Sequence, residues 1–98
     1  MAYNFLCETS NQPNWQKLNN LLKKCGSLES FPIIEASEDK FGLAISIPMR
    51  NAGRTAYRQF VYVQKVLTKK FGFKIYDMYY GKEVDKEHIK VIKGEIKQ

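Results

Sequence analysis

Few side chains in this 98-residue sequence could support catalysis. The single histidine, His88, follows Glu87, and no serine or cysteine has the flanking base of an activated nucleophile. Neither a GxSxG motif nor a metal-ligand spacing occurs. A lone histidine in a charged segment is typical of a solvated residue, and we interpret His88 as one. The sequence therefore predicts a protein that is not an enzyme.

Asp77 is the acidic residue with the most unusual position, because it falls in the inward phase of an otherwise apolar strand pattern. A carboxylate there should lie at the strand end, be paired, or be catalytic. We favour the strand end or the pairing. Ferredoxin-like nucleases can use an aspartate at the end of the first strand, but that place here reads Glu8-Thr9-Ser10. A small ferredoxin-like enzyme such as a nuclease is kept as a third alternative.

The sequence predicts no cofactor and no metal site. Its six glycines are scattered, with no GxGxxG pattern and no P-loop lysine. Cys7 and Cys25 lack a CxxC spacing, and we expect two buried free thiols because cysteine is often a small core residue.

Residues 51–72 form an amphipathic segment around which the chain is organised. At about 100° per residue, its apolar and basic residues fall on opposite arcs. The apolar arc holds Ala56, Phe60, Val63, Leu67 and Phe71. The basic arc holds Arg54, Arg58, Lys65 and Lys69, with Val61 and Tyr62 beside them. This pattern predicts a helix that covers a sheet with one face, begins at a cap by Asn51 and ends at Gly72.

The net charge of +6 is unevenly distributed. Residues 1–50 hold five basic and five acidic side chains, whereas residues 51–98 hold eleven basic and five acidic ones. The second half therefore carries the whole excess. Such asymmetry favours an acidic partner, although lysines also simply keep small proteins in solution.

The elements that precede this helix follow from periodicity. Alternation predicts a strand over residues 2–9, and a core-facing helix over residues 14–25 with Ser10 or Asn11 as its cap and Pro13 in its first turn. Further strands are predicted over residues 31–36 and 41–49, with a polar turn at 37–40.

After the helix, a fourth strand is predicted over residues 73–80. One of its faces combines bases and aromatics, namely Lys74, Tyr76, Met78 and Tyr80. Residues 82–98 are open between a helix capped by Asp85 and an extra strand, and Gly94 favours the strand.

The order β-α-β-β-α-β predicts a single α+β domain over residues 1–98. We expect a ferredoxin-like fold, in which an antiparallel four-stranded sheet carries both helices on one face because each joins parallel neighbouring strands. The predicted core is Phe5, Cys7, Trp15, Leu18, Leu22, Ile45, Ile47, Phe60, Val63, Leu67 and Ile75. The outer sheet face should carry Asn4, Leu6, Ala44, Ser46, Tyr76 and Tyr80.

The leading functional hypothesis is a small binding protein of inhibitor or regulator type, as phages and mobile elements often carry. It would engage an acidic protein through the basic helix face, because tyrosine with arginine is typical of interface hot spots. The alternative is a nucleic-acid-binding domain in which the helix contacts phosphates and exposed tyrosines stack on bases. RNA-recognition domains stack bases on aromatics of their first and third strands, but the third strand here presents Gly42, Ala44 and Ser46.

The candidate partner-binding residues for both hypotheses are Arg54, Arg58, Val61, Tyr62, Lys65, Lys69, Lys74, Tyr76 and Tyr80. No apolar run approaches the roughly 20 residues of a membrane span. The N-terminus also lacks the pattern of a signal peptide, so a cytoplasmic location without membrane contact is expected.

Overall fold

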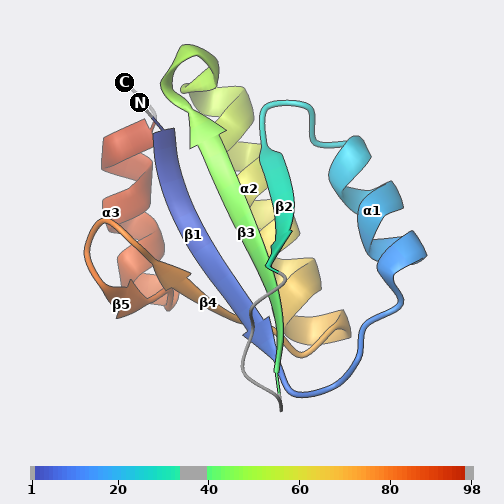
Figure 1. Ribbon diagram of the computed structural model, residues 1–98. Helices are drawn as coiled ribbons and strands as arrows, with labels where there is room; N and C mark the ends of the chain where they lie inside the picture. Colours follow the sequence, from blue (N-terminus) through green and yellow to red (C-terminus); the bar gives the residue numbers. More distant parts are fainter. Residues whose placement is uncertain (1, 34–39, 97–98) are drawn as a thin grey trace.

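Strand β1 (Ala2–Thr9) lies in the middle of an antiparallel sheet whose five strands have the order β2-β3-β1-β4-β5 (Figure 1). The computed structural model describes residues 2–33 and 40–96. The other strands are β2 (Glu29–Ile33), β3 (Phe41–Pro48), β4 (Lys74–Asp77) and β5 (Lys82–Glu83). The predicted α+β class is confirmed, but the sheet has five strands rather than four.

Helices connect strands that are parallel but not adjacent. Helix α1 (Trp15–Lys23) joins β1 to β2, and α2 (Arg54–Lys70) joins β3 to β4. Both β1 and β2 are antiparallel to β3, which lies between them, and β1 separates β3 from β4 in the same way. The expectation that each helix joins immediate neighbours is therefore wrong. A short 3₁₀ helix, η1 (Met49–Asn51), precedes α2, and helix α3 (Lys86–Ile96) follows β5.

One face of the sheet is covered by the helices (Figure 1). The other, here called the open face, is only partly exposed, because Gly42 and Ser46 of β3 are buried there; the expectation that Ser46 lies exposed on the outer face is therefore wrong. Alternate residues of β1 are buried, as the period of a half-covered strand requires. On the covered face the ring of Phe5 stacks on Phe60 of α2, with 4.3 Å between the ring centroids. Most of the predicted core is buried, namely Phe5, Cys7, Leu18, Leu22, Ile45, Ile47, Phe60, Val63, Leu67 and Ile75. Trp15 is the exception, because it is half-buried at the start of α1.

Helix α2 has the faces that its periodicity predicts. Its buried residues are Ala56, Phe60, Val63 and Leu67. Its start differs from the prediction, because Gly53 precedes the first turn and Asn51 lies in η1, where its side chain donates to the carbonyl of Ser27 at 3.4 Å. Gly72 follows the last turn with φ of 68°, which confirms the predicted glycine end.

The first helix and second strand are shifted from their predicted positions. Asn14, not Ser10 or Asn11, caps α1 by accepting the Lys17 N–H at 3.2 Å, so Pro13 lies before the helix. Strand β2 begins at Glu29. The predicted strand residues 34–36 and turn residues 37–39 lie outside the described part of the chain.

The tail is a helix preceded by a two-residue strand, so the favoured interpretation of an extra strand over its length is wrong. The Asp85 carboxylate accepts the backbone N–H of His88 at 2.7 Å and caps the first turn of α3. The buried side of α3 holds His88, Ile92 and Ile96. This burial outweighs the cost of Gly94, which is about 1 kcal/mol. The predicted strand 73–80 is also shorter, because β4 ends at Asp77 and a turn follows.

Candidate functional site

The exposed face of α2 gathers the basic residues that the sequence singles out. Arg54, Arg58, Lys65 and Lys69 are all exposed. The ring of Tyr62 lies among them and is 53% exposed, while Val61 is half-buried. At 1.5 Å per residue, the four charges extend over about 22 Å of helix. The opposite face of α2 is fixed in the core, so these side chains project from a rigid support.

The charges of this face are not neutralised within the described residues 2–33 and 40–96. Ion pairs there join Lys40 to Glu8, Arg50 to Glu29 and Lys90 to Glu87, and the ring of His88 is hydrogen-bonded to Asp77. The cations of α2 take part in none of them, and its first turn contains no acidic residue. Within the described residues, the face therefore presents its positive charge to solvent.

Helix α3 adds a further cation to one end of this face. A pocket of about 240 Å³ is lined by Arg54, Tyr57 and Arg58 of α2 and by Lys93 of α3. Nζ of Lys93 lies 6.0 Å from the centre of the Tyr57 ring, at the edge of cation–π range. Sequence reasoning missed Tyr57 and Lys93. Tyr57 follows Arg54 at the i+3 spacing, so the sequence does indicate it, whereas Lys93 lies in a tail whose sequence is compatible with both a helix and a strand.

The other predicted residues do not share one surface. Tyr76 lies opposite Leu6 of β1 in the sheet register and is half-buried on the open face, with Lys74 exposed on the same strand. Tyr80 follows the end of β4 and turns to α3, where its hydroxyl donates to Glu95 at 2.7 Å and its ring meets His88 edge-on. The hydrogen bond to Glu95 raises the pKa of Tyr80. Both rings stay partly exposed, but the predicted continuous face over Lys74, Tyr76, Met78 and Tyr80 does not exist because β4 ends too early.

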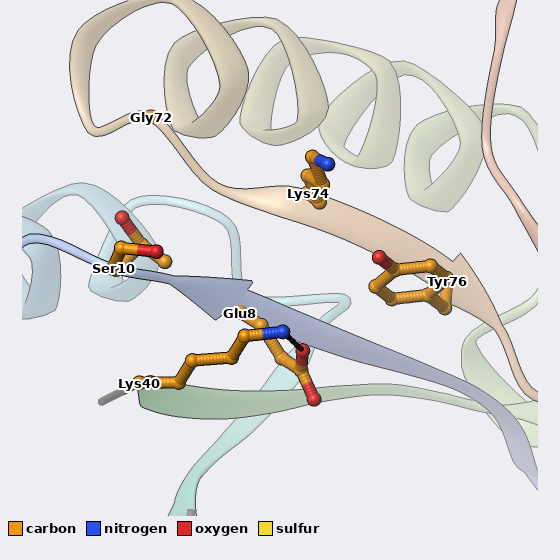
Figure 2. A pocket seen from close by; sticks show the side chains of 7 residues that line it. Glu8, Ser10, Lys40, Gly72, Lys74 and Tyr76 are labelled. Atoms are coloured by element: carbon orange, nitrogen blue, oxygen red, sulfur yellow. Dashed lines mark hydrogen bonds and ion pairs between the residues drawn. The ribbon is translucent and has the colours of Figure 1, made fainter. Parts of the chain in front are cut away.

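A shallow pocket of about 110 Å³ lies beside Lys74 and Tyr76 (Figure 2). Its wall also includes Glu8, whose carboxylate pairs with Nζ of Lys40 at 3.4 Å. The charge of Glu8, the acidic residue of this lining, is therefore balanced by Lys40. Lys74 is left as the remaining cation of the lining.

The open face also carries a row of apolar residues in direct register. Phe31 of β2 lies opposite Ala44, Ala44 opposite Leu6, and Leu6 opposite Tyr76. Phe31 is 54% exposed at one end of this row. The middle positions, on β3 and β1, are aliphatic. The face therefore lacks central aromatics for base stacking, as the sequence predicts.

Asp77 and His88 meet inside the protein. His88 is 2% exposed and Asp77 is 0% exposed, so the interpretation of His88 as a solvated histidine is wrong. The cause is the packing of α3 on the covered face, which brings His88 to the end of β4. Asp77 lies at the strand end and is paired, as the favoured interpretation states. Both groups are closed to solvent, and their contact joins the end of β4 to α3.

Among the described residues, no group of three or more His, Cys, Asp or Glu side chains could hold a metal ion. Both cysteines are free and buried, which confirms the predicted thiols, and burial raises the pKa of each. None of the helices in residues 2–33 and 40–96 is long and apolar enough to cross a membrane. No protein-family model, curated protein or solved structure matches this chain.

Proposed function

We propose that this chain is a small non-enzymatic binding protein of inhibitor or regulator type. It engages an acidic protein surface through the exposed face of α2. The observation that carries the proposal is the half-exposed ring of Tyr62 among cations that pair with no acid in the described residues. Tyrosine and arginine supply most of the binding energy in many interfaces, while surrounding charges steer the encounter.

The scaffold of this proposal is a ferredoxin-like unit made of β1 to β4 with α1 and α2. The element order and the antiparallel arrangement β2-β3-β1-β4 support this assignment. Strand β5 and helix α3 are additions at the β4 edge. The role of the scaffold is to hold α2 in place, because a pre-ordered helix loses little conformational entropy on binding.

The second candidate function is nucleic-acid binding. It is favoured by the half-buried Tyr76 and exposed Phe31 on the open sheet face, with Lys74 beside Tyr76. In this alternative, single strands would stack on the aromatic rings and α2 would contact phosphates. The aliphatic middle of the row makes it the weaker candidate.

Capture of a partner from the native host, with nuclease treatment of the lysate, tests the proposal. Tyr62→Ala should weaken binding of the captured protein by about thirtyfold, as loss of a hot spot of about 2 kcal/mol requires. Tyr79→Ala is the matched control, because Tyr79 is exposed in the turn after β4. Equal losses in the two variants, or no loss in either, would contradict the proposed surface.

Oligonucleotides distinguish the second candidate. Four phosphate contacts by α2 predict that log affinity for single strands falls with log salt at a slope of about −3. Each cation removed should make that slope shallower by roughly one unit. Binding that is absent at concentrations up to about 100 μM in low salt would exclude nucleic acid, because the electrostatic contribution alone should reach that range.

A further inference from the structure

The pocket between α2 and α3 brings together charges that nothing in its lining balances. Arg54 and Arg58 reach it from the start of α2, and Lys93 reaches it from the last turn of α3. No carboxylate lines it, and none of the three cations forms an ion pair within residues 2–33 and 40–96. Folding thus gathers like charges around one hollow, and an anion bound there would relieve their repulsion.

The lining suits a tetrahedral oxyanion. Guanidinium groups present paired N–H donors that match phosphate oxygens, and lysine adds a point charge. The ring of Tyr57 forms a wall, and Nζ of Lys93 lies 6.0 Å from its centre. The volume of about 240 Å³ is far above the roughly 10–15 Å³ that one water molecule needs, so a phosphate with bound waters fits.

We propose that this pocket binds a phosphate monoester carried by the protein partner, an inference that rests on the proposed function. A phosphorylated side chain has a charge of about −1.5 to −2 near neutral pH and three acceptor oxygens. Three cations complement this charge better than that of a single carboxylate. Arg58 lies one helical turn before Tyr62, so the pocket and the tyrosine belong to one continuous surface.

Titration of the protein with O-phosphoserine at constant ionic strength, followed by NMR, tests the pocket directly. Saturable shifts should appear at Arg54, Tyr57, Arg58 and Lys93, and acetate should bind at least about tenfold more weakly. Lys93→Gln should weaken phosphoserine binding by about tenfold, because it removes a charge-assisted contact. The matched control is Lys23→Gln, which removes an equal charge from an exposed position of α1 outside the proposed surface and should leave binding within about twofold.

Four results would overturn the proposal. One is the absence of saturable shifts, and another is an equal loss in Lys23→Gln, which would show that the effect comes from net charge alone. The third is tighter binding of a random single-stranded oligonucleotide than of a phosphoserine peptide, which would assign the phosphate to nucleic acid. The fourth is tighter binding of inorganic phosphate than of the phosphoserine peptide, which would contradict a phosphate carried by a protein.

The pocket and the proposed function can fail separately. If partner capture depends on Tyr62 but phosphoserine does not bind, the pocket proposal is wrong and the proposed α2 surface is supported. In the opposite case, Tyr62→Ala would leave partner capture unchanged, while Lys93→Gln would abolish both partner capture and phosphoserine binding. That result would support the pocket and exclude Tyr62 as an anchor. Lys93 is exposed, so its replacement by glutamine should leave the melting temperature unchanged and the comparison clean.

Discussion

Nε2 of His88 lies 2.6 Å from Oδ2 of Asp77, and both side chains are closed off from solvent. The same carboxylate accepts the Tyr3 hydroxyl and the backbone N–H groups of Tyr79 and Tyr80. Burial, and then the hydrogen bond to Asp77, raise the pKa of Tyr3, so its hydroxyl stays a donor. One carboxylate therefore joins β1, the turn after β4 and helix α3.

Asp77→Ala should destabilise the fold by more than about 3 kcal/mol, because it leaves several buried donors without their acceptor. Asp85→Ala is a control with the same chemical change at an exposed helix cap, and should cost about 1 kcal/mol. Urea unfolding of both variants measures the difference. A cost at Asp77 no larger than that at Asp85 would mean that the buried cluster contributes little to stability.

Leu67→Ala should cost about 2–5 kcal/mol, because Leu67 is fully buried on the covered side of α2. Arg58→Ala, on the opposite side of the same helix, should change stability by no more than about 0.5 kcal/mol. Thermal or denaturant unfolding provides both values. Equal destabilisation would show that the two faces of α2 are assigned wrongly.

Acid should loosen the first turn of α3. The hydrogen bond from the His88 backbone N–H lowers the pKa of Asp85 below its ordinary value of 3.8. Since the folded pKa is the lower one, the cap's contribution is present above that ordinary value and is lost as pH falls through the folded pKa. Asp85→Asn keeps a capping oxygen that does not titrate, so its stability should fall less steeply with acid. Parallel pH profiles of the two proteins would contradict this.

Two glycine substitutions should act in opposite directions. Gly72 has φ of 68°, and a Cβ there meets only ordinary contact with Thr9, so Gly72→Ala should cost about 1–2 kcal/mol through backbone strain alone. Gly94 lies inside α3 with open space around it, so Gly94→Ala should stabilise by about 0.5–1 kcal/mol. Melting temperatures test both, and a stabilising Gly72→Ala would disprove the strain.

The parts of the fold that local patterns determine could be predicted from the sequence. The sequence alternation of residues 41–49 and the two faces of α2 each repeat over many residues, and both predicted elements are present, although β3 ends at Pro48 and Met49 lies in η1. The sequence of residues 82–98 is compatible with both a helix and a strand, and the choice between them depends on packing against α2 and β4. Local propensity at Gly94 favoured the wrong one because burial of Ile92 and Ile96 outweighs it.

Site residues show the same division. The bases of α2 lie where their helical spacing predicts. The positions of Tyr80 and Lys93 instead depend on α3, because Tyr80 is hydrogen-bonded to Glu95 of that helix and Lys93 belongs to it. The sequence predicts an exposed position for His88, because its partner, Asp77, lies on another element. Its burial is a property of tertiary structure, and no spacing of types within the tail indicates it.

The pairing of β1 with β4 also bears on how the protein is made. Tyr3 and Asp77, joined by a hydrogen bond, are 74 positions apart in the chain. During synthesis, β1 emerges first and must wait for β4 before one of its edges is paired. Contacts of such sequence separation slow folding, since a long loop must close before they form. On the ribosome, the edge of β1 that faces β4 therefore stays unpaired until the segment around Asp77 is released, which makes this interval the time at which chaperones would be needed most.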